Sequence, residues 1–434
     1  MNAFEIRGGK SLHGSITAQG AKNEALQILC AVLLTDEAVT LTNVPNIIDV
    51  NTLIDVLEAM GVRVERPAAN TVVLQANNIN PDYFIDPGFK KKSGKLRGAV
   101  MLAGPMLSRF KKAHIPQPGG DKIGRRRLDT HIRGFEALNV KFNYDPDEYL
   151  FTLDGSEMRG GNIMMEEPSV TGTANVIMAA VLAEGVTTIY NAACEPYVQQ
   201  LCRMLNSMGA RISGISSNFL TIEGVSKLHG CTHRMLADMI EVGSFIGLAA
   251  MTQSDLTIKN ADVAHLGIIP ETFQRLGIQL EIQGDDIHVP AQERYRINKF
   301  IDGSILTVYD HPWPGFTPDL LSIILVVATQ AKGTVLVHQK MFETRLFFVD
   351  KLIDMGAQIV LCDPHRAVVI GLDRQEPLRG IDMVSPDIRA GVALLIAALS
   401  AQGKSTIQNI QQIDRGYERI DERLNALGAD IRRI

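Results

Sequence analysis

The chain has 434 residues, of which 46% are hydrophobic and 21% charged, and its formal net charge is −5 at pH 7. This length suggests two or three domains of about 150 residues each, and the slightly acidic balance argues against a general binder of nucleic acids or anionic membranes. The longest apolar runs, Leu320–Ala328 and Gly391–Leu399, are much shorter than the roughly 18 residues that a membrane-spanning helix needs.

The N-terminal segment and the cysteines point to a reducing compartment. The first residues, MNAFEIRGGKSLHG, lack the apolar segment of a signal peptide. The five cysteines, at positions 30, 194, 202, 231 and 362, are scattered and show no CxxC spacing. Such a set is typical of reduced core residues and of neither a disulfide framework nor a zinc site. We therefore expect a cytoplasmic protein without a metal.

A short pattern recurs six times along the chain. In chain order the copies read LEAMGVRVE at 57–65, FEALNVKFN at 135–143, LNSMGARIS at 205–213, FQRLGIQLE at 273–281, LIDMGAQIV at 352–360 and LNALGADIR at 424–432. Each joins the end of an amphipathic helix to a strand through one Gly or Asn, residues that tolerate a left-handed helix end. These turn residues are Gly61, Asn139, Gly209, Gly277, Gly356 and Gly428. Because their spacings of 78, 70, 68, 79 and 72 residues extend over the whole chain, chance does not explain the pattern.

A second helix, apolar on all sides, belongs to most of these units. Examples are EALQILCAVLL, ANVIMAAVLA, GSFIGLAAM, DLLSIILVVA and RAGVALLIAAL. Such helices are buried rather than amphipathic, and most precede a β-branched strand such as VTTIYNA or GTVLVHQ. The unit is too short for an independent domain and too long for a usual solenoid repeat. The sequence predicts an α/β fold of two domains with three units each, with helices inside sheets. A single large α/β sheet would contain no internal repeat.

Polar residues stand where the apolar helices begin. Three of these starts carry a hydroxyl residue: Ser169, Thr317 and Ser385. We interpret them as N-caps rather than catalysts, since such residues favour a helix start. Capping does not explain Lys22, Arg97 and Arg389, because a cation is unfavourable at the positive end of a helix dipole. This placement indicates that an anion binds there. If the units face one another, these helix starts converge on a site for phosphates and carboxylates.

Residues 118–131, PGGDKIGRRRLDTH, form a second polar cluster. Glycine makes the segment rich in turns, and four cations charge it: Lys122, Arg125, Arg126 and Arg127. A solvated charge run is the ordinary interpretation, but Gly-rich basic loops also bind phosphates through backbone N–H groups and guanidinium forks. The GxxxxGK[ST] spacing of a P-loop is absent, so nucleotide hydrolysis is not supported.

Six motifs in chain order carry a family resemblance. They are GAKNEAL (20–26), LRGAVMLAGP (96–105), PGGDKIGRR (118–126), TPD (317–319), MFETR (341–345) and IDRGYERI (413–420). Together they resemble the signatures of the UDP-N-acetylglucosamine 1-carboxyvinyltransferase family over essentially the whole chain. The resemblance implies two inside-out α/β barrel domains, each with three repeated units in pseudo-threefold arrangement. Residues 22–235 are expected to form the first domain, with the mobile loop 118–127, and residues 1–21 plus 236–434 the second.

The resemblance also implies a reaction. The enolpyruvyl group of phosphoenolpyruvate is transferred to the 3′-hydroxyl of UDP-N-acetylglucosamine and phosphate is released, in the first committed step of peptidoglycan precursor synthesis. In this addition and elimination, a general acid protonates the methylene carbon, a general base takes the hydroxyl proton, and cations hold the phosphate and carboxylate. No cofactor or metal is implied, and no nucleic-acid or membrane partner.

The family's functional positions map onto this chain through the motifs. Asp121 occupies the general-acid position and Asp319 the general-base position. The catalytic set is completed by Lys22 and Arg415, which with Asn23 and Arg126 also match the phosphoenolpyruvate site. The nucleotide-sugar positions are Arg97, Arg126, Arg127, Leu128, Asp129, Thr130, Ser169, Val170, Asp319 and Met341. Polar residues of the family's cleft are matched by Arg345, Asp387 and Arg389.

Three positions depart from the family pattern. Most members have cysteine where Asp121 stands, although an aspartate subgroup exists; the cysteine thiolate is the group that the epoxide fosfomycin alkylates. Glu167 replaces a lysine that usually binds the diphosphate, and Arg127 replaces a proline beside the loop arginine. We hypothesise that Arg127 supplies the positive charge that Glu167 removes.

Two other functions compete with this interpretation. The 5-enolpyruvylshikimate-3-phosphate synthases share the fold and donor, but their LPGSKS and NAGTAMR-type motifs are absent and GAKN and PGGDKIG stand in their places. A non-catalytic sensor of nucleotide sugars is favoured by Glu167. The joint presence of an acid, a base and three cations argues against a sensor, because binding alone needs no acid–base pair.

Overall fold

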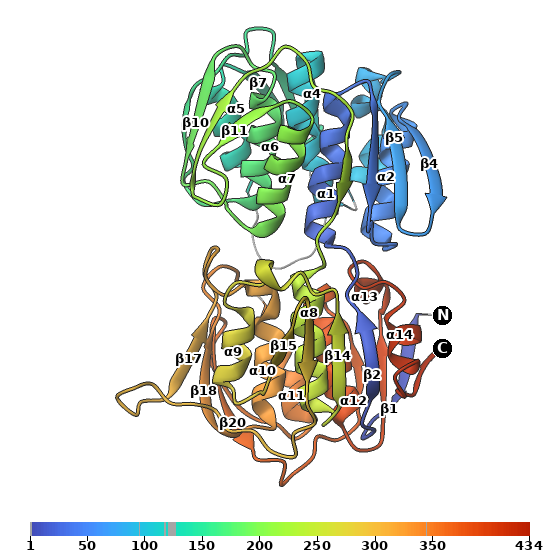
Figure 1. Cartoon of the computed structure of the whole chain (residues 1–434), viewed down its shortest axis with the longest axis vertical. Coiled ribbons are helices and arrows are strands. Elements are labelled where there is room, and N and C mark those ends of the chain that lie inside the picture. Colours follow the sequence, from blue (N-terminus) through green and yellow to red (C-terminus); the bar gives the residue numbers. More distant parts are fainter. Residues whose placement is uncertain (1, 95, 117–118, 120–126, 344) are drawn as a thin grey trace. The chain divides into compact units, whose positions relative to one another are not determined.

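The computed structural model describes residues 2–94, 96–116, 119, 127–343 and 345–434. Within them the chain forms two compact units (Figure 1). The inserted unit comprises Gly20–Gly120 and Arg126–Leu236. The terminal unit comprises Met1–Gln19 and Ala237–Ile434, and therefore contains both ends of the chain.

Each unit has three sheets in the part of the chain that the structure describes. In the inserted unit the sheet orders are β13-β3-β5-β4 (Thr232–Arg234, Ala38–Thr42, Thr71–Gln75, Arg63–Ala68), β6-β8-β7 (Lys112–Pro116, Leu150–Asp154, Lys141–Asp145) and β11-β12-β10-β9 (Arg211–Ser213, Phe219–Glu223, Val186–Tyr190, Asn162–Met164). In the terminal unit they are β15-β16-β14-β2 (Glu281–Gln283, Asp286–Val289, Asp255–Lys259, His13–Thr17), β17-β18-β20-β19 (Leu306–Tyr309, Lys332–His338, Arg366–Leu372, Gln358–Asp363) and β21-β22-β1-β23 (Asp382–Val384, Lys404–Gln408, Ala3–Arg7, Ile431–Arg433).

All the four-stranded sheets share one pairing pattern. One edge strand pairs parallel with its neighbour, and the remaining pairs are antiparallel, as in β2–β14 followed by β14–β16 and β16–β15. The sheet β6-β8-β7 contains only the antiparallel pairs among its described strands. A pairing pattern that recurs from sheet to sheet confirms that the six sequence copies are copies of one structural unit.

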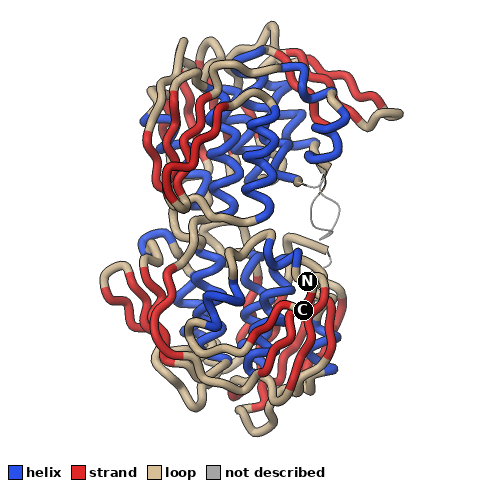
Figure 2. The backbone as a smooth tube through the Cα atoms, turned by 90° about the vertical axis from the view of Figure 1, so that its right-hand side faces the viewer, coloured by secondary structure: helices blue, strands red, loops and turns tan. Residues whose placement is uncertain are grey.

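The apolar helices lie inside these sheets. They are α1 (Lys22–Ala31), α4 (Ala103–Phe110) and α6 (Val170–Ala180) in the inserted unit, and α8 (Met239–Met251), α10 (Leu321–Thr329) and α12 (Ile388–Ser400) in the terminal unit. Figure 2 shows helices in the interior of each unit and strands toward its outside. All thirteen residues of α8 are buried, and α8, α10 and α12 pack against one another. The prediction of helices inside sheets is confirmed.

A second set of helices leads into the six predicted turns. These are α2 (Ile48–Ala59), α5 (Asp129–Ala137), α7 (Pro196–Ser207), α9 (Ile269–Arg275), α11 (Val349–Asp354) and α14 (Ile420–Asn425). All six turn residues are left-handed, with φ of 63° at Asn139 and between 92° and 106° at the glycines. The left-handed helix ends predicted from the sequence are therefore confirmed.

Small residues set the distance between inner helices. A Cβ on Gly247 of α8 would lie 2.4 Å from Cγ2 of Ile323 on α10, closer than side chains approach. The absence of a side chain at this position therefore lets the two helices approach. The remaining helices are α3 (Pro87–Ser93), α13 (Gln411–Asp414) and the 3₁₀ segments η1 (Val32–Leu34), η2 (Pro81–Ile85), η3 (Arg97–Leu102), η4 (Val263–His265) and η5 (Pro318–Leu320).

Candidate active site

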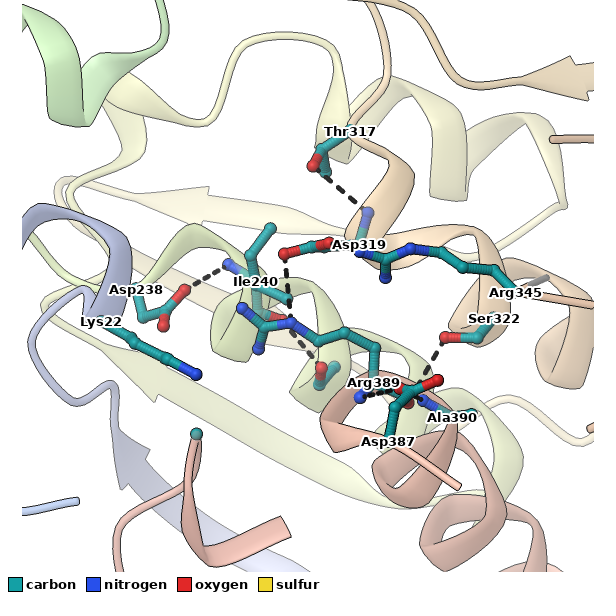
Figure 3. A network of polar contacts seen from close by, with 12 residues as sticks. Lys22, Asp238, Ile240, Thr317, Asp319, Ser322, Arg345, Asp387, Arg389 and Ala390 are labelled. Carbon is teal, nitrogen blue, oxygen red and sulfur yellow. Dashed lines mark hydrogen bonds and ion pairs between the residues drawn. The ribbon is translucent and has the colours of Figure 1, made fainter. Parts of the chain in front are cut away.

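Asp319 lies at the start of an inner helix of the terminal unit, between two arginines. Thr317 caps the short helix η5, and its hydroxyl accepts a hydrogen bond from the Asp319 backbone N–H at 3.4 Å. Arg345 Nη2 donates to Asp319 Oδ1 at 2.7 Å, and Arg389 Nε donates to Oδ2 at 3.2 Å (Figure 3). The three side chains are only 17%, 12% and 7% exposed, so water screens this network little.

Arg389 is itself held at the N-terminus of α12. Asp387 is the N-cap and accepts hydrogen bonds from the backbone N–H groups of Arg389 and Ala390, at 2.7 and 2.9 Å. Burial alone would lower the pKa of the Arg389 guanidinium, but the Asp319 carboxylate, with Tyr417 and Asp238, raises it above its usual value. The cation at this helix start thus has an anion beside it, and in this structure that anion is the protein's own carboxylate.

The N-cap predicted at Ser385 is wrong. Ser385 Oγ donates to the Asp387 carbonyl at 3.1 Å, and the helix begins at Ile388, two residues later than the Ser-Pro pattern indicates. The reason is that the Asp387 carboxylate satisfies two N–H groups of the first turn, more than one hydroxyl does. The caps predicted at Ser169 and Thr317 are confirmed, since Ser169 Oγ accepts from the Gly172 N–H and Thr317 caps η5.

A chain of hydrogen bonds connects Arg389 to the interior. Arg389 Nη1 donates to the Tyr417 hydroxyl at 3.4 Å, and this hydroxyl donates to Ser244 Oγ at 2.9 Å, because the single hydroxyl proton of Ser244 is used in another bond. Ser244 in turn donates to the Ile240 carbonyl at 2.7 Å. Burial raises the pKa of Tyr417 to about 12, although Arg389 and Ser244 oppose the shift. Tyr417 is therefore a neutral residue that fixes the orientation of Arg389.

Two further predicted residues belong to the terminal unit. Met341 is partly exposed, and its backbone N–H donates to Asp310 Oδ2 at 3.1 Å. Asp310 also accepts from the Lys340 N–H and the Gln339 amide, and burial raises its pKa although the two backbone N–H groups oppose this. Arg415 is the C-cap residue of α13 and donates to Gln412 Oε1 at 2.8 Å.

A pocket opens beside the Asp319 network. Its lining comprises Pro318, Ser322, Gln339, Arg345, Leu346, Asp387, Arg389 and Ala390. Arg345 and Arg389, the two arginines that hold Asp319, thus also line a small polar pocket together with Asp387.

In the inserted unit the predicted cation Lys22 begins helix α1. Lys22 and Asn23 are its first two residues, and the Lys22 ammonium lies 2.7 Å from Asp49 Oδ2, with the two side chains 8% and 6% exposed. Asp49 belongs to the first turn of α2. As at Arg389, a carboxylate faces a cation at a helix start.

The predicted nucleotide-sugar residues of this unit gather at three helix starts. Arg97 begins η3 and its Nη2 donates to the Arg127 carbonyl at 3.3 Å. Thr130, in the first turn of α5, donates to Glu167 Oε1 at 3.4 Å. The other members of this set are Leu128 and Asp129 at the start of α5, and Ser169 and Val170 at the start of α6. Glu167, one of the departures from the family pattern, therefore contacts a predicted ligand residue.

Asp121 and Arg126 lie outside the described residues. Among the residues that the structure does describe, no group of three or more His, Cys, Asp and Glu is placed to hold a metal ion. In the same part of the chain, none of the helices combines the length and apolar character needed to cross a bilayer.

Sequence reasoning missed four supporting residues: Asp49, Asp310, Tyr417 and Gln19. In the sequence, Asp49 is an acidic residue in the first turn of a helix, and Asp310 is an aspartate directly after a strand. Both placements are common, so neither indicates a functional site. Tyr417 lies inside the IDRGYERI motif, and its place in that motif could have identified it as a residue of the site. No local pattern in the sequence distinguishes Gln19.

Comparison with known proteins places the chain in a family. The family model described as EPSP synthase (3-phosphoshikimate 1-carboxyvinyltransferase) matches residues 6–424. Proteins named UDP-N-acetylglucosamine 1-carboxyvinyltransferase from Porphyromonas gingivalis and Bacteroides thetaiotaomicron are each 64% identical over 434 residues, covering 100% of both chains. The protein of that name from Treponema denticola is 47% identical over 431 residues, or 99% of each chain.

Solved structures show the same fold. The enolpyruvyl transferase NikO from Streptomyces tendae is similar with a TM-score of 0.86 and 21% identity, covering 99% of this chain and 98% of that one. EPSP synthase from Acinetobacter baumannii is similar with a TM-score of 0.77 and 16% identity, covering 100% and 99%. The structural likeness supports the fold, and the full-length sequence identity supports the closer relationship. The chain therefore belongs to the UDP-N-acetylglucosamine 1-carboxyvinyltransferase family.

Proposed function

We propose that the protein transfers the enolpyruvyl group of phosphoenolpyruvate to the 3′-hydroxyl of UDP-N-acetylglucosamine and releases phosphate, as the first committed step of peptidoglycan precursor synthesis in the cytoplasm. The observation that carries this proposal is the 64% identity to enzymes with that name over the entire chain. The proposed partners are two small molecules, and the chemistry requires neither a cofactor nor a nucleic-acid or membrane partner.

Asp319 is the proposed general base. Guanidinium groups stay protonated in proteins, so Arg345 and Arg389 favour the ionised carboxylate that a base needs. In the addition step the sugar oxygen forms a bond to C2 of phosphoenolpyruvate, its proton passes to Asp319, and Asp121 delivers a proton to C3. In the elimination step C3 loses a proton, the bond between C2 and the phosphate oxygen breaks, and phosphate leaves with that electron pair.

The donor's negative charges are assigned to cations. Lys22, Arg126 and Arg415, with Asn23, are proposed to hold the phosphate and carboxylate of phosphoenolpyruvate. The 2.7 Å ion pair with Asp49 supports this for Lys22, because it fixes a buried ammonium in place before the ligand arrives. Such preorganised cations stabilise charge that develops in the transition state.

The nucleotide sugar is assigned to the helix starts of the inserted unit, together with Asp319 and Met341. Free N–H groups and a positive dipole at helix starts favour the diphosphate. Glu167 adds negative charge beside Thr130, which is unfavourable for a diphosphate, and Arg127 is proposed to offset it.

One observation favours shikimate 3-phosphate as an alternative acceptor: the EPSP synthase family model matches residues 6–424. Phosphate release should therefore be measured with phosphoenolpyruvate and either UDP-N-acetylglucosamine or shikimate 3-phosphate. Phosphate release that occurs only when UDP-N-acetylglucosamine is the acceptor supports the proposal. Phosphate release that occurs only when shikimate 3-phosphate is the acceptor contradicts it. Binding of the nucleotide sugar without turnover would identify a sensor instead.

The base is tested by Asp319→Asn, which keeps the size of the side chain and removes its charge. General bases contribute typically 10²–10⁴-fold, so kcat should fall by at least about a hundredfold. Asp363→Asn is the matched control, because Asp363 also accepts from an arginine, Arg366, but lies on β19 and forms no described hydrogen bond with Asp319, Arg345 or Arg389. A loss of less than about tenfold in Asp319→Asn would show that another group takes the proton.

A further inference from the structure

Gln19 is a buried amide with two hydrogen bonds to one distant turn. Its Nε2 donates to the Gly416 carbonyl at 2.8 Å, and its Oε1 accepts from the Glu418 backbone N–H at 2.7 Å. A carbonyl can only accept and an N–H can only donate, so both amide atoms are fixed by their partners. Gln19 is 7% exposed, which means that water does not compete for these bonds.

The backbone of Gln19 is anchored as well. Its N–H donates to Glu241 Oε2 at 2.7 Å, and its carbonyl accepts from the Asp238 N–H at 2.8 Å. Glu241 is fully buried and forms an ion pair with Arg423, at 2.6 Å from Nη1. The side chain of Gln19 therefore extends from a fixed point to the turn that it binds.

The turn that Gln19 binds directly follows Arg415. Gly416 and Glu418 flank Tyr417, whose hydroxyl contacts Ser244 and Arg389. Arg415 is the C-cap residue of the four-residue helix α13, and its side chain donates to Gln412 of that helix at 2.8 Å. The backbone that follows Arg415 is held by the N–H groups of Gly416 and Tyr417, which donate to the Ile413 carbonyl, and from outside α13 by the Gln19 amide. Among the described residues, the hydrogen bonds of Gln19 do not involve any of the proposed substrate-binding side chains.

We propose that Gln19 is a positioning residue for phosphoenolpyruvate: by holding the turn 416–418, it presents the Arg415 guanidinium to the donor's negative groups. This inference rests on the proposed function, in which Arg415 binds phosphoenolpyruvate. Loss of the amide lets the turn relax, so the cation no longer stands where the ligand needs it. Affinity for the donor then falls, whereas affinity for the nucleotide sugar is retained.

Gln19→Met tests the idea, because Met has nearly the same length and shape but makes neither hydrogen bond. We expect the KM for phosphoenolpyruvate to rise about tenfold, as the loss of two buried hydrogen bonds allows. The Kd of UDP-N-acetylglucosamine, measured by calorimetry, should stay within about twofold. An unchanged KM for phosphoenolpyruvate would overturn the proposal.

The chain offers a matched control in the same unit. Gln292 also bridges a carbonyl and an N–H two residues apart, donating to Gly277 O at 3.1 Å and accepting from the Gln279 N–H at 2.7 Å. Gln292→Met therefore removes the same pair of bonds from a turn without a proposed ligand. It should leave the KM for phosphoenolpyruvate unchanged. An equal rise in both variants would mean that loss of any such amide merely loosens the fold, and would overturn the proposal.

A double-variant cycle separates this inference from the proposed function. If Gln19 acts through Arg415, Gln19→Met should have no further effect on the KM in an Arg415→Met background. Additive effects would overturn the inference. If Arg415→Met raises the KM and Gln19→Met does not, the inference fails and the proposed role of Arg415 stands. If Arg415→Met itself leaves the KM unchanged, the assignment of Arg415, and the inference with it, is wrong.

Discussion

At the residue scale, two of the three cations at the helix starts share one arrangement, in which a carboxylate faces the cation. Lys22 faces Asp49 at 2.7 Å, and Arg389 faces Asp319 at 3.2 Å. The attraction within a buried ion pair only roughly offsets the free energy lost when the two charges leave water. Pairs of this kind are therefore weak evidence for stability. Their value here is to keep charged groups fixed and dehydrated where charged ligands are expected to bind.

Asp121 carries a prediction that follows from the family resemblance. A carboxylate is a much weaker nucleophile toward an epoxide than a thiolate, so the protein should not be inactivated by fosfomycin. Asp121→Asn should abolish turnover, because an amide cannot donate the proton, while nucleotide-sugar binding is retained. Asp121→Cys should keep activity and become sensitive to fosfomycin.

The measurement is residual activity after incubation with fosfomycin, with mass spectrometry of the protein. Wild type and Asp121→Cys are treated side by side, so the variant serves as the positive control. Covalent modification of the wild type at any residue of the segment 118–127 would show that the interpretation of Asp121 is wrong.

At the element scale, one histidine connects helices of the inserted unit. His131 of α5 contacts Thr171 Oγ1 through Nε2 at 3.2 Å and Asn175 Nδ2 through Nδ1 at 3.0 Å. Because Asn175 Oδ1 accepts from the Gly104 N–H, its Nδ2 is the donor, and Nδ1 of His131 must be an unprotonated acceptor. The neutral His131 of α5 thus binds α6, and Asn175 of α6 in turn binds α4.

This arrangement predicts a pH-dependent stability. Burial, with a smaller effect of Arg97, lowers the pKa of His131 from 6.5 to about 3. Between these values the unfolded chain binds a proton that the folded chain does not, so stability is complete above pH 6.5 and falls as the pH decreases toward 3. The slope is about 1.4 kcal/mol per pH unit, so between pH 7 and pH 5 this residue costs about 2 kcal/mol of unfolding free energy.

Urea unfolding at pH 7 and pH 5 checks the prediction. From pH 7 to pH 5, the decrease in unfolding free energy should be about 2 kcal/mol smaller in His131→Gln than in wild type, since the variant has no group to titrate at this position. His13→Gln, at an exposed site on β2, should behave like wild type. Equal losses in wild type and His131→Gln would contradict the assignment of a neutral, buried His131.

At the scale of the whole molecule, the two units differ in how the chain builds them. All the described strands of the inserted unit come from residues 20–236, whereas the terminal unit needs β1 and β2 from the first nineteen residues. Strand β1 lies between β22 and β23, and β2 pairs with β14. The chain ends meet there, since the Asn2 N–H donates to the Ile434 carbonyl at 3.0 Å (Figure 1).

We therefore predict different behaviour for two fragments. Residues 20–236 should unfold cooperatively on heating, because they contain every described strand of the three sheets of the inserted unit and its hydrophobic core. Residues 237–434 should not, because they lack β1 with Phe4 and Ile6, both fully buried. Each such side chain contributes about 1.5–3 kcal/mol, a large share of a typical stability of about 5–15 kcal/mol.

Joining residues 1–19 after Ile434 by a short linker should restore cooperative unfolding of the 237–434 fragment, since the chain ends are adjacent. Circular dichroism during heating provides the measurement for all three proteins. Cooperative unfolding of the fragment 237–434 alone would show that β1 is dispensable. If the fragment 20–236 does not unfold cooperatively, the inserted unit depends on the rest of the chain.

The sequence by itself determined the repeated unit, the buried helices, the left-handed turns and the family. All of these depend on neighbouring residues: periodicity of side chains within a helix, a Gly or Asn at its end, and short motifs in order. Even so, local patterns failed at Ser385, where the carboxylate of Asp387 is the stronger cap. The roles assigned to Asp121, Arg126 and the other substrate-binding positions stay predictions.

Only the tertiary structure decided how the polar residues are paired. Arg345 and Arg389 both bind Asp319, and Gln19 binds Glu418 across 399 positions of the sequence. No local pattern encodes such pairs, because they arise only when three repeated units pack and bring the starts of different inner helices together. Propensity and periodicity act over a few residues, whereas a hydrogen bond between distant segments depends on the packing of the entire unit.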